Sequence, residues 1–347
     1  MRKRIMLERL ELENFTAFDK LDMSFSPGIN LFIGENGTGK THILKILYAV
    51  LAALSGQKPT DQEVAISDKV NAVFMPWEGN LGRLAKRKPG TTNTAIHITK
   101  DSKRVNMSFH NRTKRKLECS VHWDMPVKDS SIYIPVKEML ANAPGFHSLY
   151  KEHMIHFAEV YADIVRKAFI PPKKGQPSTD RSGLMEMIRK VIEGKVISKG
   201  EHFFLKNKHG ELEFDLLAEG MRKLGLLWLL IQNGALLEGA KLFWDEPEAN
   251  LNPSMIKTVA EILLSLQKSG VQVFIATHSY VVLKQFDLLK TKKNSVRFFE
   301  LYRDKDTQSI LHREGESYLD IVPNKISDAY TDIYDAEVHR RLGGPIT

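Results

Sequence analysis

The sequence predicts an α/β protein with a sheet that is parallel at its centre and flanked by helices. Apolar runs typical of buried strands occur at residues 29–33, 241–244 and 271–276. A segment with helical periodicity follows the first two runs, and alternation of strands with helices implies parallel strands. Functional groups are expected at the carboxyl ends of such strands. The 347 residues, 42% of them hydrophobic, are enough to form a large core.

The N-terminal region predicts two strands before the first buried one. Residues 10–15 and 21–25 alternate between apolar and polar side chains, and Pro27-Gly28 predicts a turn. From Thr41 to about Gly56, apolar residues recur at the helical period. The chain therefore predicts strand, loop and helix in succession around residues 34–41.

The middle of the chain is more polar and predicts a second, antiparallel unit. Alternating runs at 94–99, 105–109 and 117–123 predict a meander beside the main sheet. Residues 147–168 have a helical pattern, and the proline-rich stretch 171–178 predicts a loop.

The positive charge is concentrated in residues 81–128. That segment has twelve Lys and Arg against three acidic residues, so it is +9 in a chain of net charge +8. A dense basic segment is typical of a protein that binds DNA or RNA, because each neutralised phosphate releases counterions. The alternative is a solvated basic surface that keeps the protein soluble.

The sequence favours a cytoplasmic protein that does not enter a membrane. The basic N-terminus becomes charged again before any apolar stretch long enough for a secretory signal. The longest apolar run, 224–231, is too short to cross a bilayer. A single cysteine, Cys119, cannot form an internal disulfide, which fits a reducing compartment.

Residues 34–41 match the pattern G-x-x-x-x-G-K-[ST]. In such a loop the backbone N–H groups hold phosphates, the lysine reaches the β and γ oxygens, and the hydroxyl binds Mg²⁺. Because a predicted strand and helix flank the loop, nucleotide binding is favoured over a structural glycine turn. The residues expected to contact ATP and its Mg²⁺ here are Asn36, Gly37, Thr38, Gly39, Lys40 and Thr41.

Acidic residues and a histidine follow two of the predicted buried strands. Asp245, after residues 241–244, is expected to hold Mg²⁺, and Glu246 to polarise the attacking water. His278 follows residues 271–276 and lies 33 positions after Asp245. The structural alternatives are a helix cap for the acidic pair and a loop cap for the histidine.

The order of these motifs resembles the soluble ABC-type ATPases that include RecF, SMC and OLD proteins, and the AAA_15- and AAA_21-like families. In this resemblance, residues 34–41 correspond to Walker A, 217–223 to a degenerate ABC signature, 242–246 to Walker B, 249–252 to the D-loop and 277–279 to the switch histidine. Residues 10–18 resemble the N-terminal strand of that branch, whose loop lies near the adenine, and 134–138 occupy the Q-loop position.

The resemblance implies an ABC-type ATPase head with a mixed central sheet, an antiparallel β subdomain and a helical lobe. Residues 1–56 and 215–315 would form the ATP-binding core lobe, with a basic β-rich insertion at 57–135. Residues 136–214 would form the helical lobe that leads to the signature, and 316–347 a C-terminal helical tail.

The same resemblance implies a head-to-tail dimer or higher oligomer, in which Glu219 and Gly220 of one copy face the ATP bound by the other. Glu246 would activate water and His278 would sense the γ-phosphate; ATP binding would close the dimer and hydrolysis would release it.

Two positions depart from the family. Ala218-Glu219 replaces the signature serine, and the Q-loop contains Glu138 instead of glutamine. A carboxylate facing a triphosphate is unfavourable unless it turns away or a cation compensates it.

Three hypotheses for the role of this ATPase remain. Compact chains of this kind resemble the ATPase subunits of bacterial anti-phage systems such as Septu, PARIS and retron-associated systems, which implies a sensor or scaffold that controls a separate effector. The second is a RecF-like DNA-binding clamp in which residues 81–128 hold duplex DNA. The third is a nucleotide-binding assembly module with negligible turnover.

The C-terminal tail has an apolar stripe at the helical period. It consists of Ile326, Ala329, Tyr330, Ile333, Tyr334 and Val338. Packing against its own domain is the favoured interpretation, and docking of a partner is the alternative.

Overall fold

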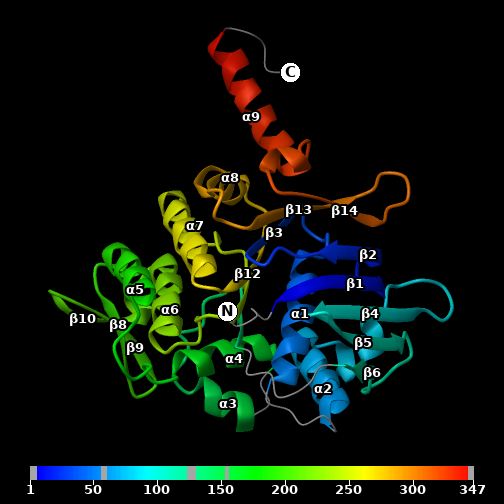
Figure 1. Cartoon of the computed structure of the whole chain (residues 1–347), viewed down its shortest axis with the longest axis horizontal. Coiled ribbons are helices and arrows are strands. Elements are labelled where there is room, and N and C mark those ends of the chain that lie inside the picture. Colours follow the sequence, from blue (N-terminus) through cyan, green and yellow to red (C-terminus); the bar gives the residue numbers. More distant parts are fainter. Residues whose placement is uncertain (1–5, 56–60, 123–129, 153–155, 343–347) are drawn as a thin grey trace.

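The computed structural model describes residues 6–55, 61–122, 130–152 and 156–342, within which the strands form three sheets. Figure 1 shows a mixed sheet through the middle of the molecule, with an antiparallel sheet on one side and a lobe of helices on the other. The predicted fold class, α/β with a mixed central sheet, is confirmed.

The central sheet brings together strands that are far apart in the sequence. In spatial order they are β14 (Ile310–Gly315), β13 (Val296–Arg303), β3 (Ile29–Gly34), β12 (Gln272–Thr277), β11 (Lys241–Asp245) and β7 (Ser131–Ile134). All neighbouring pairs are parallel except β13 and β14. Every residue of β3, β11 and β12 is buried, as expected for parallel strands covered on both faces. Because these strands are parallel, their carboxyl ends lie at one edge.

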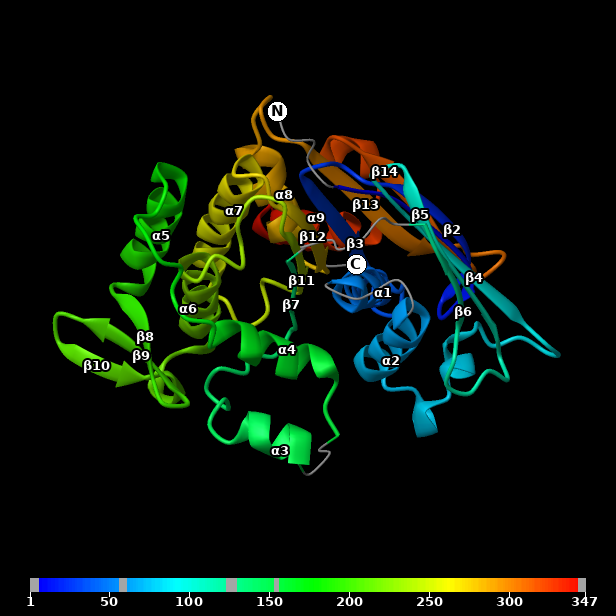
Figure 2. The ribbon, with the colours of Figure 1, turned by 60° about the horizontal axis from the view of Figure 1, so that its bottom comes forward.

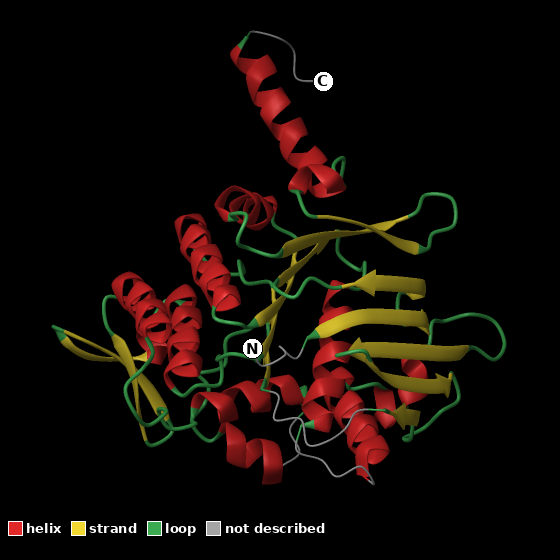
Figure 3. Ribbon diagram, viewed as in Figure 1, coloured by secondary structure: helices red, strands yellow, loops and turns green. Residues whose placement is uncertain are grey.

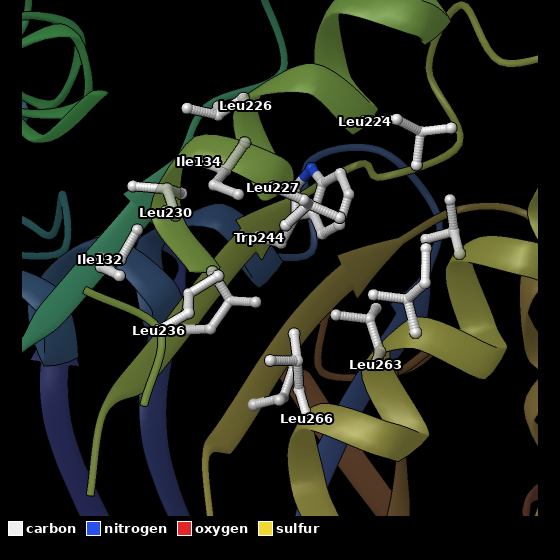
Figure 4. Close-up of a cluster of buried hydrophobic side chains, with 14 of the residues drawn as sticks. Ile132, Ile134, Leu224, Leu226, Leu227, Leu230, Leu236, Trp244, Leu263 and Leu266 are labelled. Carbon is white, nitrogen blue, oxygen red and sulfur yellow. The ribbon is translucent and has the colours of Figure 1, made fainter. Parts of the chain in front are cut away.

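Alternate side chains of the central strands point into two separate cores. On one face, Phe243 and Phe274 stack with ring centroids 5.0 Å apart beneath α1 (Lys40–Leu54). On the other face, Trp244 and Ile275 pack under α6 (Glu219–Gln232) and α7 (Pro253–Lys268). Figure 4 shows this second core, where leucines of α6 and α7 surround Trp244.

The antiparallel sheet joins the N-terminal strands to the middle of the chain. Its order is β2 (Phe18–Ser24), β1 (Leu7–Phe15), β4 (Asn93–Lys100), β5 (Lys103–His110) and β6 (Glu118–Val121). The predicted runs 94–99 and 105–109 fall within β4 and β5, whereas Trp123 of the third lies outside the described residues. Helices α1 and α2 (Gln62–Phe74) pack on the inner face of this sheet (Figure 2).

The lobe on the other side is not entirely helical. It contains α3 (Phe146–Glu152), α4 (Glu159–Ala168), α5 (Thr179–Ile192) and α6. Between α5 and α6 lies a three-stranded antiparallel sheet of β8 (Lys195–Lys199), β9 (His202–Asn207) and β10 (Gly210–Glu213), visible in Figure 3. The sequence analysis did not predict this sheet. Short 3-10 turns occur at Trp77–Gly79, Leu81–Leu84, Phe214–Leu216 and Tyr318–Ile321.

The last two helices are α8 (Tyr280–Leu289) and α9 (Lys325–Arg341), and α9 projects away from the rest of the molecule (Figure 1). Within α9 only Ser327 is buried. Ile333 and Tyr334 of the apolar stripe keep 67% and 65% of their surface exposed. The interpretation that the whole stripe packs on its own domain is therefore wrong, because the helix leaves the body after its first turns.

Candidate nucleotide-binding site

The loop at residues 34–41 connects the carboxyl end of β3 to the start of α1. Its Gly37 and Gly39 have φ angles of 79° and 91°, a region that favours glycine. A Cβ on Gly39 would lie 2.5 Å from the Phe18 ring, whereas a Cβ on Gly37 would meet nothing within 4 Å. Gly39 is the N-cap of α1 and provides no side-chain cap, so the first N–H groups of the helix remain available to an anion.

Lys40 folds back over this loop. Its Nζ donates to the carbonyls of Gly34 at 2.6 Å and Glu35 at 2.9 Å. Burial lowers the pKa of Lys40, and the carboxylates of Glu246 and Asp245 oppose that shift. Thr38 closes the loop by donating its hydroxyl to the Glu35 carbonyl at 2.8 Å. The ammonium is thus already held at the centre of the loop.

Asp245 lies beside the loop because β11 and β3 both flank β12. Thr41 Oγ1 donates to Asp245 Oδ1 at 3.1 Å, and Tyr133 of β7 donates its hydroxyl to Oδ2 at 3.0 Å. Burial raises the pKa of Asp245, and the two donors counteract it. A hydroxyl next to a carboxylate is a donor set that suits Mg²⁺, which prefers oxygen ligands. The sequence analysis missed Tyr133.

Glu246 and His278 meet at the same edge. His278 Nδ1 lies 3.2 Å from Glu246 Oε1. The Glu246 backbone has a φ of 48° and its N–H donates to Ala276 of β12 at 2.8 Å. The structure therefore brings Lys40, Thr41, Asp245, Glu246 and His278 together from three adjacent strand ends.

A further carboxylate that the sequence analysis missed, Glu248, holds the histidine loop in place. Its Oε1 accepts from the Thr277 hydroxyl at 2.6 Å and from the His278 backbone N–H at 3.2 Å. The side chain is buried. Its position two residues after Glu246 was the only signal in the sequence, and an acidic residue in a loop is too common to be distinctive.

The signature residues lie at the start of α6 and contact the D-loop of the same chain. Asn250 Nδ2 donates to Glu219 Oε2 at 2.8 Å, and Lys223 Nζ donates to the Ala249 carbonyl at 2.5 Å. A Cβ on Gly220 would lie 2.9 Å from Leu251. Over the described ranges, no hydrogen bond or ion pair connects Glu219 or Gly220 to the phosphate loop of its own chain.

The Q-loop carboxylate is also turned toward the signature helix. Glu138 forms an ion pair with Arg222, with Nε and Oε2 3.2 Å apart, and accepts from the Leu140 N–H. Burial raises the pKa of Glu138. Arg222 therefore neutralises Glu138. Glu219 instead accepts its hydrogen bond from Asn250, whose side-chain amide is uncharged.

Residues 106–284 match the model of the AAA_21 family, described as "AAA domain, putative AbiEii toxin, Type IV TA system". The match covers more than half of the chain. The chain belongs to the AAA_21 family. The predicted resemblance to soluble ABC-type ATPases of the RecF and SMC branch is confirmed, and the likeness to anti-phage subunits stays a prediction.

Segments of RecF proteins are similar to this AAA_21 chain. The DNA replication and repair protein RecF of Streptococcus suis (strain 05ZYH33) is 36% identical over 104 residues, which cover 30% of this chain and 26% of that protein. RecF of Staphylococcus aureus (strain JH9) is 32% identical over 102 residues, covering 29% and 26%. The chain thus spans about a quarter of the length of these relatives.

Two solved structures share the fold of this AAA_21 protein. An SMC head bound to the C-terminal winged-helix domain of ScpA aligns with a TM-score of 0.53 at 14% identity, covering 88% of this chain and 97% of that one. An SMC head with an extended coiled coil, bound to the C-terminal domain of ScpA from Pyrococcus furiosus, aligns with a TM-score of 0.53 at 11% identity, covering 95% and 99%. At these identities the likeness shows the fold alone.

The basic segment of the AAA_21 chain forms a hollow of about 940 Å³ over β4 and β5. Its rim includes Arg112, Lys114 and Arg115, none of which forms an ion pair with another described residue. Lys88, also on the rim, pairs with Asp19 at 2.9 Å and donates to Asn14 at 2.7 Å. Asp124 and Lys128 of the basic segment lie outside the described residues.

No helix among the described residues of this AAA_21 protein is both long enough and apolar enough to cross a membrane.

A buried carboxylate next to the phosphate loop predicts a pH dependence of stability. Burial raises the pKa of Glu300, on β13, from 4.5 to about 7, although Arg313 lies 3.4 Å away. The folded state then binds this proton more tightly than the unfolded state. The free energy of unfolding should therefore fall by about 2–3 kcal/mol as the pH rises from 4.5 to 7.

Glu300→Gln should remove this decrease, as measured by urea denaturation between pH 5 and pH 8. Glu316→Gln, at an exposed position, is the matched control and should behave as the wild type. An unchanged pH profile in Glu300→Gln would mean that another group titrates.

Proposed function

We propose that this chain binds ATP with Mg²⁺ and hydrolyses it. The observation that carries the proposal is the convergence of Lys40, Thr41, Asp245, Glu246 and His278 at the carboxyl ends of β3, β11 and β12. Bound Mg²⁺-ATP supplies the phosphoanhydride bond that water attacks. Lys40 and the N–H groups of residues 36–41 hold the phosphates.

The remaining side chains of the site bind Mg²⁺, orient the attacking water and sense the terminal phosphate. Thr41 and Asp245 provide the oxygen ligands for Mg²⁺, and Tyr133 keeps the carboxylate of Asp245 oriented. Glu246 orients the attacking water and accepts its proton. His278 faces Glu246 from the next strand end, where it can sense the terminal phosphate.

The site is completed by a second copy in a head-to-tail dimer. Glu219 contacts Asn250 of the D-loop, and no hydrogen bond or ion pair within the described ranges connects Glu219 or Gly220 to the phosphate loop of their own chain, which supports their facing the loop of another copy. Asn250 satisfies one oxygen of Glu219, which reduces the repulsion between that carboxylate and a triphosphate.

Glu246→Gln should lower ATP turnover by about 10²–10⁴-fold while ATP binding persists, because the amide retains the shape of the side chain but cannot accept the proton. Lys40→Ala should weaken ATP binding itself. Phosphate release and the binding of a fluorescent ATP analogue measure the two effects. Glu238→Gln, an exposed control, should leave both unchanged. Normal turnover in Glu246→Gln would refute the catalytic assignment.

The role that we infer for this ATP cycle is control of a separate effector in a bacterial anti-phage complex. The family description, which refers to an AbiEii toxin and a type IV toxin–antitoxin system, supports a place in such systems. The chain should then co-purify with the product of a neighbouring gene, and ATP should change the amount recovered. A single isolated gene, or recovery that is indifferent to ATP, would count against this role.

The basic hollow favours a second candidate, a nucleic-acid clamp. Arg112, Lys114 and Arg115 present three cations without ion partners among the described residues, and Asn14 on the same rim belongs to the segment that resembles the adenine-binding loop. RecF, the protein of the matched relatives, is named for DNA replication and repair. DNA or RNA held in this hollow would lie next to the bound nucleotide.

Changing Arg112, Lys114 and Arg115 together to Gln should weaken binding of duplex DNA and reduce the slope of log K against log salt concentration by about 2–3. Fluorescence anisotropy at several salt concentrations, with DNA and RNA of the same sequence, measures both. The control changes three exposed lysines elsewhere, Lys174, Lys257 and Lys305. Equal losses in the two triple variants would mean that the hollow has no special role.

A further inference from the structure

The helix α9 projects from the body, but its first turns are held by the rest of the chain (Figure 1). Its N-cap residue Asn324 is buried, and the Asn324 side chain accepts a hydrogen bond from the Ser327 N–H at 2.9 Å. Tyr330 stacks on Tyr280 of α8, with ring centroids 4.7 Å apart. These contacts fix the backbone of Lys325, the first residue of α9, although the far end of the helix leaves the body.

Arg313 of β14 ties the segment before α9 to the central sheet. Its Nη1 donates to the Pro323 carbonyl at 2.7 Å and lies 3.4 Å from Oε2 of the buried Glu300 on β13. Glu300 lies opposite Ile33 of β3, the residue just before the phosphate loop. The root of α9 is therefore connected to the strand that leads into this loop.

Lys325 forms the direct contact with the phosphate loop. Its Nζ lies 2.8 Å from Oε2 of Glu35, the second residue of the loop. The backbone carbonyl of Glu35 accepts from Lys40 Nζ at 2.9 Å. Burial lowers the pKa of Lys40, and Glu35 is among the carboxylates that oppose this shift. A negative side chain thus lies within electrostatic reach of the ammonium that would bind the β and γ phosphates.

The Glu35 carboxylate is unfavourable for a loop that binds a polyanion, because Mg²⁺-ATP keeps a net negative charge. One unit charge about 10 Å from a doubly charged anion changes its binding about fourfold in water, and more where the dielectric constant is lower. The ammonium of Lys325 supplies a positive charge that cancels this repulsion. Both side chains are half exposed, so the ion pair adds little to the stability of the fold.

We propose that Lys325 is a positioning residue of the ATP site: its ammonium neutralises Glu35 so that the phosphate loop accepts a triphosphate. The proposal rests on the ATP binding of the proposed function. Lys325 acts through Glu35 on nucleotide binding, whereas Glu246 and His278 act on the chemical step. Because Lys325 is supplied by α9, any change that lifts the root of α9 away from the loop lowers the affinity for ATP.

The test measures binding of a fluorescent ATP analogue with Mg²⁺ to full-length wild type, Lys325→Gln, and the double variant Lys325→Gln, Glu35→Gln. Lys325→Gln should bind the analogue about four- to tenfold more weakly, because the carboxylate of Glu35 is then uncompensated. The double variant should recover most of this loss, since the two charges act as a pair. Lys325→Arg keeps the charge and should bind as the wild type.

Turnover gives a readout that a merely structural role would not produce. In Lys325→Gln the KM for ATP should rise about as much as the affinity falls, while kcat changes less than about twofold.

Lys206→Gln is the matched control. Lys206 lies on β9 in the other lobe, is half exposed like Lys325, and pairs with Glu211 at 3.1 Å. This variant should bind the analogue as the wild type does. Thermal unfolding should agree among all the variants, because each loses only an exposed ion pair.

The other outcomes separate this proposal from the proposed function. Equal affinity in wild type and Lys325→Gln would overturn the role of Lys325. A loss that Glu35→Gln does not relieve would overturn the charge mechanism, and an equal loss in Lys206→Gln would show that any lysine has the same effect. Wild type that does not bind the analogue would refute ATP binding itself, before the variants are compared.

Discussion

The hydrogen bond between Thr41 and Asp245 is the contact on which the rest of the site depends. It joins the end of the phosphate loop to a strand 204 residues further along the chain. Since β11 is separated from β3 only by β12, the bond also fixes where Glu246 and His278 stand relative to Lys40. Tyr133 donates a hydrogen bond to the Asp245 carboxylate, and Glu248 accepts one from Thr277 in the histidine loop. The parallel order of these strands is therefore the physical basis of the candidate chemistry.

In the signature segment, Glu219, which departs from the family pattern, forms a contact with the D-loop. Glu219 takes its donor from Asn250 of the D-loop, and Lys223 donates to the Ala249 carbonyl in the same loop. Arg222 is used by Glu138. Polar contacts thus tie the start of α6 to the loop after β11, so that movement of the helical lobe and of the D-loop would be coupled. This coupling gives the helical lobe a route to the residues of the candidate site.

Three surface features differ in how they are connected to the candidate ATP site. The basic hollow adjoins the turn at Asn14, whereas α9 is rooted on Glu35 and Tyr280. A lysine-rich hollow, rimmed by Lys190, Lys195 and Lys208 among others, belongs to the same lobe as α6. The basic hollow and α9 therefore each border a segment of the candidate ATP site.

The sequence by itself determined the elements and the residues whose signals are local. The glycine loop, the buried runs that became β3, β11 and β12, and the positions of Asp245, Glu246 and His278 follow from periodicity and from motifs of a few residues. The β8–β10 sheet has short, polar strands, so its pattern was too weak to recognise. Tertiary structure alone decided the partners: Tyr133 reaches Asp245 because β7 pairs with β11, Glu219 turns to Asn250, and α9 leaves the body. Such contacts depend on strand order and helix direction, which connect residues far apart in the chain and leave no local pattern.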